Sequence, residues 1–397
     1  MDASDAMPKG PLTGVRILDL SRILAGPTCT QLLGDLGATV LKVENPGTGG
    51  DDTRQWGPPY VKDGSEDTDL SAYFMCANRN KLSVAIDIAT PEGQAEIRRL
   101  AGMADIFIEN FKPGGLAKYG LDQASLATEH PRLVYCSISG YGQTGPNREK
   151  PGYDLMAQGY GGIMSITGEP DGEPMKVGVG IADVMCGMYA TVGILAALRH
   201  AEATGQGQHI DVALVDAQIA WTINEGVNTR LTGEAPLRRG NGHPNIVPYG
   251  VYETSDGHVI IAVGNDSQFR RFVALFGLDH LADDPLFATN PARIVNRDAL
   301  ADHLVPAVRR KSTDDMIAML EGARVPVGPV QTLPQVFASD QAQARGLALD
   351  MTSDGLTLPL IGNPLHLSQT PVTYRRPPPR FGADNARLEA SDPFSEE

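Results

Sequence analysis

The sequence has 397 residues, of which 42% are hydrophobic and 20% charged, values typical of globular proteins and not of disordered chains. Its formal net charge of -15 argues against binding to nucleic acid or to anionic membranes, because both need a basic surface. A chain of this length usually divides into domains, so we expect a large domain and a smaller one.

The first half of the chain alternates apolar, β-branched runs with helical stretches. Strands are predicted at residues 15–20, 38–43, 105–109 and 133–138, and helices at residues 26–35 and 91–102. Pro27 suits the start of the first helix, and Gly34 and Gly37 suit its end. Because this alternation produces βαβ units, it predicts an α/β fold with a Rossmann-like parallel sheet.

The second half begins with a long helix and then changes in pattern. A buried helix is predicted at residues 181–200, a strand at 209–214, a second helix at 215–231, and a hairpin at 251–254 and 258–263. We place a small α+β domain at residues 233–323, between the two parts of the large domain, 1–232 and 324–397. Residues 325–330 and the proline-rich residues 375–380 are expected to return to the large domain.

The sequence shows no targeting segment and no membrane span. The N-terminal residues MDASDAMPKG contain no apolar run, and the longest apolar stretch, residues 185–198, is shorter than the roughly 20 residues of a span. The cysteines, Cys29, Cys76, Cys136 and Cys186, form no CxxC pair, so we expect buried, reduced thiols and no metal site. These features predict a cytoplasmic protein.

Motif spacing alone does not identify the chemistry. The glycine-rich turns at residues 47–50 and 159–162 lack the spacing of nucleotide-binding fingerprints. The sequence also lacks the HExxH and GxSxG patterns of zinc and serine hydrolases. Composition and spacing therefore lead only to an α/β enzyme.

A series of segments resembles the family III CoA-transferases, also called the CaiB/BaiF family. In chain order they are LDLSRILAGP (18–27), LGATVLKVE (36–44), IENFKPG (108–114), SGYG (139–142), GYDLMAQ (152–158), TGEPDG (167–172), TGQGQ (204–208) and RGNGHP (239–244). The resemblance extends over nearly the whole chain. It implies an interlocked homodimer, with a Rossmann-like large domain and a small domain inserted before its C-terminal part.

The resemblance also implies that Asp171 is the nucleophile, although Asp-Gly by itself is an ordinary tight-turn dipeptide. A carboxylate with a pKa of about 3.9 is ionised at neutral pH and needs no partner base. It attacks the acyl-CoA to form a mixed anhydride, the released CoA returns to form an aspartyl-CoA thioester, and an acceptor carboxylic acid reverses the exchange. Gly240-Asn241-Gly242 matches the family's glycine-rich loop, which covers this intermediate.

The expected CoA site also follows from the resemblance, with Leu24 and Ala25 near the thiol. Along the nucleotide it implies Asn45, Ile86, Asp87, Asn110, Phe111, Lys112, Lys118, Ser139 and Tyr141. Lys118 stands where relatives often have Arg, and Ser139 replaces a Lys of formyl-CoA transferase. CoA and acyl-CoA are then substrates, and no tightly bound cofactor or metal is expected.

The expected substrates are an acyl-CoA and a carboxylic acid. Leu24 replaces the Gln that formyl-CoA transferase uses beside its small acyl group, which favours a larger acyl chain. Residues 238–249 resemble transferases that use succinyl-CoA as donor to another dicarboxylate. Arg54, Arg239 and His243 are candidates for binding the distal carboxylate.

Two alternative functions remain open. An acyl-CoA racemase or epimerase of the same superfamily exchanges the proton α to the thioester with a His and an Asp. Asp183 matches that Asp, but Tyr153 stands in the place of the His. A non-catalytic CoA-binding subunit is the second alternative, since fold does not guarantee activity, and the presence of Asp171 argues against it.

Overall fold

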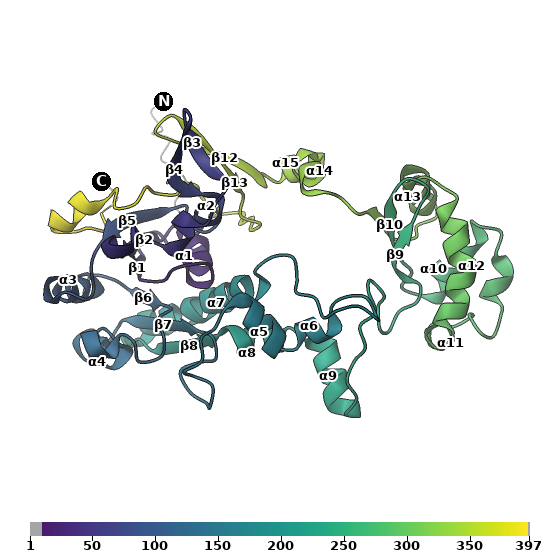
Figure 1. Ribbon diagram of the computed structural model, residues 1–397, viewed down its shortest axis with the longest axis horizontal. Coiled ribbons are helices and arrows are strands. Elements are labelled where there is room, and N and C mark those ends of the chain that lie inside the picture. The colour runs from purple at the N-terminus through teal and green to yellow at the C-terminus, as the bar shows by residue number, and fades with distance from the viewer. Residues whose placement is uncertain (1–9, 396–397) are drawn as a thin grey trace. The chain divides into compact units, whose positions relative to one another are not determined.

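The computed structural model describes residues 10–395, which form two units (Figure 1). Unit 1 comprises Met1–Ile163, Lys176–Gly233 and Asp340–Glu397, and unit 2 comprises Met164–Met175 and Glu234–Ser339. The N-terminal residues 1–9, where we expect no signal segment, lie outside the described part of the chain. Unit 2 therefore starts where the predicted small domain starts, but it continues to Ser339 and also takes in Met164–Met175.

Unit 1 is built on a six-stranded parallel sheet. The strands are β1 (Arg16–Asp19), β2 (Thr39–Glu44), β5 (Lys81–Ala85), β6 (Ile106–Glu109), β7 (Val134–Ser139) and β8 (His209–Ala213). Their order across the sheet is β5-β2-β1-β6-β7-β8, and every neighbouring pair is parallel. Numbered by appearance in the chain this is 3-2-1-4-5-6, the order of a Rossmann sheet. The predicted α/β, Rossmann-like fold is confirmed.

Several helices complete unit 1. They are α1 (Ala25–Asp35), α2 (Ala72–Met75), α3 (Pro91–Ala101), α4 (Gln123–Glu129), α5 (Asp154–Tyr160), α7 (Ile181–Thr204), α8 (Leu214–Ala220), α9 (Ile223–Thr232) and α15 (Asp340–Ala344). The predicted helix at 215–231 is divided in two, because Ile223 has a φ of 36°, outside the helical region.

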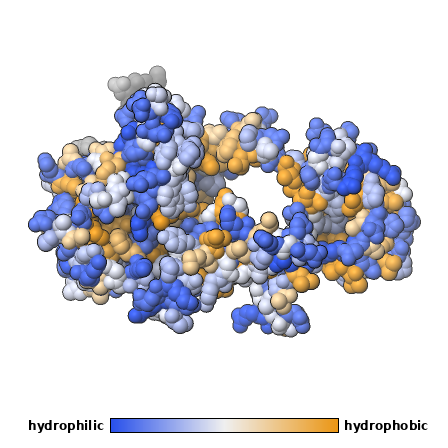
Figure 2. Space-filling view, in the orientation of Figure 1, coloured by the Kyte–Doolittle hydropathy of each residue, from blue (hydrophilic) through white to orange (hydrophobic). Residues whose placement is uncertain are grey.

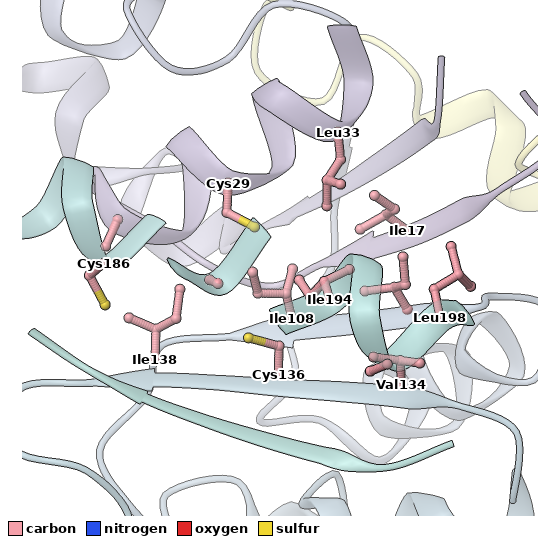
Figure 3. Close-up of a cluster of buried hydrophobic side chains, with 14 of the residues drawn as sticks. Ile17, Cys29, Leu33, Ile108, Val134, Cys136, Ile138, Cys186, Ile194 and Leu198 are labelled. Atoms are coloured by element: carbon pink, nitrogen blue, oxygen red, sulfur yellow. The ribbon is translucent and has the colours of Figure 1, made fainter. Parts of the chain in front are cut away.

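The long helix α7 packs against α1 and the sheet. Figure 3 shows this cluster, in which Ile194 and Leu198 of α7 face Leu33 of α1 and Ile108 of β6. By length and hydropathy α7 would also suit a membrane span, but half of its most apolar window is buried in this core. One face of α7 therefore belongs to the core of unit 1.

All four cysteines are free thiols. Cys29, Cys136 and Cys186 are buried in the cluster of Figure 3, as expected. Cys76 is exposed, so the expectation that all four are buried is wrong for this residue. It lies directly after the short helix α2, at the edge of the core and not within it.

Two antiparallel hairpins add to unit 1, and neither was predicted. They are β3 (Tyr60–Asp63) with β4 (Glu66–Ser71), and β12 (Ala348–Ser353) with β13 (Leu356–Ile361). The two hairpins share a small core in which Leu70, Phe74 and Leu358 are buried. The proline-rich residues 375–380 do return to unit 1, where the carbonyl of Arg376 accepts a hydrogen bond from the Asn80 amide at 2.8 Å.

Unit 2 has its own three-stranded sheet and its own core. The sheet order is β11-β10-β9, and the elements are β9 (Tyr249–Glu253), β10 (His258–Ala262), β11 (Val327–Pro329), α6 (Ile163–Ile166, which begins one residue before the unit), α10 (Asp266–Ala274), α11 (Asn290–Val295), α12 (Arg297–Arg309), α13 (Thr313–Gly322) and α14 (Leu333–Ala338). The expectation that residues 325–330 return to the large domain is wrong. β11 pairs antiparallel with β10, which satisfies its backbone within unit 2.

Candidate active site

A cavity of about 740 Å³ opens in unit 1 at the carboxyl ends of the parallel strands. Its walls come from the segments that follow β1, β2, β5, β6 and β7. In the strand order, β1 lies between β2 and β6, so the chain connections diverge on either side of it. Open α/β sheets bind their ligands at such a switch point.

The cavity brings together all the predicted CoA-binding residues except Tyr141. The lining includes Leu24, Ala25, Asn45, Ile86, Asp87, Asn110, Phe111, Lys112, Lys118 and Ser139. Tyr141 does not line it, and its ring instead packs edge-on against Tyr160, with 5.2 Å between the centroids. Tyr141 is therefore placed as a packing residue beside the site.

The loop between β1 and α1 is fixed by a buried ion pair. The Lys42 ammonium lies 2.9 Å from Asp51 and donates to the Ser21 carbonyl at 2.8 Å, while Asp51 accepts from the Ile23 amide. Burial alone would lower the pKa of Lys42, but attraction to Asp51, and then to Asp19 and Glu44, raises it instead. The pair holds Ile23 in the left-handed region, with a φ of 71°, which is unusual for a β-branched residue.

Basic side chains gather at the cavity. Lys112 and Lys118 are joined there by Arg22 and Lys150, which sequence reasoning did not single out. The Arg22 guanidinium lies 2.7 Å from Asp52 at the surface, and the Lys118 ammonium lies 4.6 Å from the Tyr119 ring centroid. Arg22 could have been found from its position just after the first predicted strand, since such loops meet at the ligand-binding edge.

Asp183 also lines the cavity, from the first turn of α7. Its neighbour Asp154 is well bonded: it accepts from the Ala182 amide at 2.8 Å and from the Gln158 side chain at 2.6 Å. Within residues 10–395, no hydrogen bond or ion pair involves the Asp183 carboxyl group. Burial, and then the charge of Asp154, raise the pKa of Asp183 to about 7. This carboxyl therefore keeps its proton to a higher pH than an ordinary aspartate does.

Asp171 lies in unit 2, exposed in a tight turn. The turn is closed by the Gly172 amide, which donates to the Glu169 carbonyl at 3.1 Å. Arg238 holds it from outside, since its guanidinium donates to the carbonyls of Glu169 at 3.2 Å and Gly172 at 2.6 Å. Sequence reasoning did not assign this role to Arg238.

The glycine-rich loop, residues 240–242, is bonded to the same turn. The Gly240 amide donates to the Gly168 carbonyl at 3.0 Å, within unit 2. Gly240 has a φ of 55°, and a Cβ there would lie 3.1 Å from the Glu169 carboxylate. The structure thus brings the predicted loop and the turn that carries Asp171 together.

Comparison with known proteins identifies the family. The model of CoA-transferase family III matches residues 12–385. The chain belongs to CoA-transferase family III. It is 48% identical to the succinate–glutarate CoA-transferase of Agrobacterium fabrum, over 96% of this chain and 95% of that one. Human succinyl-CoA:glutarate CoA-transferase is 40% identical, over 95% and 85%.

Solved structures agree with these matches. A CaiB/BaiF family protein from Brucella suis has a TM-score of 0.85 and 46% identity, covering 96% of this chain and 98% of that one. The family and the enzyme class predicted from the sequence, a CoA-transferase, are confirmed.

The three residues considered for a distal carboxylate of the CoA-transferase substrate differ in their surroundings. Arg54 is buried, and its guanidinium binds Glu44, Asp69 and the Pro379 carbonyl, so it is not available to a substrate. Arg239 and His243 both lie in unit 2, next to the glycine-rich loop, and are partly exposed. Arg239 and His243 therefore remain the candidates for binding the distal carboxylate.

No group of three or more His, Cys, Asp or Glu side chains that could hold a metal ion is found in residues 10–395.

Proposed function

We propose that this CoA-transferase moves CoA from succinyl-CoA to a second dicarboxylic acid, with glutarate as the first acceptor to test. The observation that carries the proposal is the 48% identity, over almost the full length of both chains, to a succinate–glutarate CoA-transferase. The cavity adds physical support, because its basic side chains can bind the phosphates of CoA.

Asp171 is proposed as the residue that carries the acyl group and then CoA. An exposed aspartate is ionised at neutral pH, so it can attack a thioester without a base. Each attack passes through an oxyanion, which backbone amides are suited to stabilise; one such donor contributes about 3 kcal/mol in comparable acyl-transfer sites. The hydrogen bonds from Arg238 and Gly240 fix the turn on which the carboxylate sits.

CoA is proposed to lie along the cavity of unit 1, with its thiol beside Leu24 and Ala25 and its nucleotide beside Lys112 and Lys118. The ends of the parallel strands place backbone amides and loops there, which is the usual way that Rossmann-like sheets hold phosphates. CoA enters and leaves as a substrate, and no other cofactor is part of the proposal.

We also propose a homodimer in the cytoplasm. Hydrophobic residues are visible among the hydrophilic ones on the surface (Figure 2). Along α9, three exposed hydrophobic residues follow i, i+4 spacing. These are Ile223, Val227 and Leu231, which are 68%, 65% and 83% exposed. An apolar helix face of this kind needs a partner surface, and a second copy of the chain supplies one. Four free cysteines suit a reducing compartment.

The substrate proposal is tested by incubating the purified protein with succinyl-CoA and, separately, glutarate, other dicarboxylates, monocarboxylates and carnitine. We expect glutaryl-CoA and succinate to appear in equal amounts by mass spectrometry. Acceptance of monocarboxylates only would overturn the dicarboxylate proposal. Exchange of the α-proton in deuterated water without any acceptor would indicate the racemase function instead.

The role of Asp171 leads to a mutational prediction. Asp171→Asn should lower acyl exchange by more than about 10³-fold while leaving the fold intact, because the covalent carrier is lost. Hydroxylamine should convert Asp171 of the wild type to a hydroxamate only when succinyl-CoA is present, a mass change seen by peptide mapping. The matched control is Asp354→Asn, in another exposed Asp-Gly turn, where activity should not change. Full activity of Asp171→Asn would refute the carrier role.

A further inference from the structure

Asp183 is a carboxyl group that the proposed transfer steps leave unused. It lines the cavity of unit 1, it begins the helix α7, and no partner for it exists in the described residues 10–395. Asp183 and Asp154 are both partly buried, and of the two only Asp154 is hydrogen-bonded within the described residues. An unpaired acid in a ligand cavity is a candidate for proton transfer.

The packing of α7 places Asp183 close to the part of the cavity wall that Leu24 and Ala25 form. Gly187 lies one helical turn after Asp183, on the same face of α7. A Cβ on Gly187 would lie only 2.5 Å from the Ala25 carbonyl oxygen, so this face meets α1 closely. Similarly, a Cβ on Gly180, just before α7, would lie 3.0 Å from the Leu24 side chain. If the proposed CoA orientation holds, Asp183 is therefore near the sulfur.

The sulfur of CoA changes its proton state during the proposed transfer. When the thioester C–S bond breaks, CoA leaves as a thiolate, whose conjugate thiol has a pKa of about 8.5 if it resembles cysteine. When CoA attacks the anhydride, the sulfur must again be deprotonated. A group that gives a proton and takes it back would assist both steps.

We propose that Asp183 is the acid–base group for the CoA sulfur; this rests on the proposed function above. As Asp171 attacks the acyl carbon and the C–S bond breaks, the Asp183 carboxylic acid gives its proton to the departing thiolate. When the CoA thiol then attacks the Asp171 carbonyl of the anhydride, the Asp183 carboxylate takes that proton back and the acyl acid leaves as a carboxylate. The acceptor acid runs the same steps in reverse, so no net proton is consumed.

The surroundings of Asp183 suit this role. Asp154 of α5 is the charged neighbour, and its charge adds to burial in raising the pKa of Asp183. Tyr73 of α2 and Cys186 of α7 also face Asp183, and burial followed by the charge of Asp183 raises the pKa of both. These two groups therefore stay neutral. The Asp183 carboxyl, with a pKa of about 7, is a weaker base than a thiolate and can protonate it.

The pH dependence of transfer from succinyl-CoA to glutarate tests the proposal. In the wild type, kcat should fall as the pH rises through about 7, because Asp183 must be protonated when the C–S bond breaks. Asp183→Asn should lower kcat about 10²-fold and flatten this profile, while KM for succinyl-CoA changes by less than about threefold. It should also lose the solvent deuterium isotope effect on kcat.

Two control variants make the outcome specific. Asp216→Asn changes an exposed acid that is the third residue of α8, as Asp183 is the third residue of α7. This variant should keep the wild-type dependence of kcat on pH. Glu109→Gln changes a buried carboxyl whose pKa burial also raises to about 7, and should keep the alkaline fall in kcat.

Several results would overturn the proposal. The first is a wild-type kcat that does not fall between about pH 6 and 9. The second is an alkaline fall in kcat that persists in Asp183→Asn, and the third is an alkaline fall that disappears in Glu109→Gln. The first outcome is measured on the wild type alone, so it does not depend on whether a variant folds. If the wild type transfers no CoA to any carboxylic acid, the proposed function itself has failed, which is distinct from all three.

Discussion

At the scale of single residues, the turn that carries Asp171 depends on side chains that do no chemistry. Arg238 reaches two carbonyls of the turn, those of Glu169 and Gly172, and so fixes its backbone from one side. Gly240 bonds to Gly168 from the glycine-rich loop. The nucleophile that we propose, held in this way, would lose less freedom on reaching the reacting geometry, which is how positioning residues raise the rate.

Arg238→Ala should therefore lower kcat about tenfold, as expected for the loss of roughly 1.4 kcal/mol of positioning from two charge-assisted hydrogen bonds. KM for succinyl-CoA and the melting temperature should stay near the wild-type values. Steady-state kinetics and thermal unfolding measure these quantities. Arg270→Ala, which removes an exposed arginine bonded to Asp283 in the same unit, is the control and should be silent. An equal loss of activity in both variants would contradict a specific role for Arg238.

Residue by residue, the family pattern grouped side chains that are far apart in the sequence. The resemblance placed Leu24, Asn110 and Lys118 together, and the structure brings all three to one cavity. It gave no reason to expect that Arg54 is enclosed by Glu44 and Asp69, because Asp69 reaches it through the hairpin β3–β4, which was not predicted. Nor could spacing reveal that Asp183 lacks a partner, which depends on the packing of α7 against α5.

At the scale of elements, buried ion pairs join strands of unit 1 to each other and to the segment after β2. Asp51 pairs with Lys42 of β2, and Asp19 of β1 lies 3.3 Å from the Lys81 ammonium of β5. Burial by itself would raise the pKa of Asp51 and Asp19, but attraction to these lysines outweighs it, and both values are lowered. Of the two pairs, Lys42 and Asp51 line the cavity.

A carboxyl group whose pKa is lower in the folded state than in the unfolded state stabilises the fold when the pH is above its unfolded pKa of about 3.9. This stabilisation is lost as the pH falls through the folded pKa. We therefore expect unit 1 to lose stability below about pH 4. Asp51→Asn should destabilise the protein by roughly 3 kcal/mol at neutral pH, because it leaves Lys42 buried without its partner. Chemical denaturation at several pH values measures both effects. Unchanged stability of Asp51→Asn at pH 7 would contradict this account.

The elements found from the sequence are those with clear periodicity. The apolar runs of β1, β2, β6 and β7 were visible because strands of a parallel sheet are buried on both faces. β5 was missed because it starts with Lys81, and a lysine is usually exposed. Lys81 is buried here because it pairs with Asp19, which the sequence does not reveal. Residues 325–330 were assigned to the wrong domain, since local pattern does not say which sheet a short strand joins.

At the scale of the whole molecule, the apolar face of α9 is expected to lie in a subunit interface. Val227→Glu should convert a dimer to a monomer in light scattering, because a charge replaces a side chain that a partner would bury. Val295→Glu, at a single exposed valine of α11, is the control and should leave the mass unchanged. A wild type that scatters as a monomer at micromolar concentration would refute the homodimer.

Unit 2 is assembled from two stretches of chain, Met164–Met175 and Glu234–Ser339, and Asp171 belongs to the shorter one. A fragment made of Glu234–Ser339 alone would therefore lack the Asp171 carboxylate. Chimaeras made between relatives would likewise have to swap both stretches together, or the donated glycine-rich loop would meet a foreign turn. An exchange of Glu234–Ser339 between relatives is thus constrained by Met164–Met175, which lies well before that segment in the sequence.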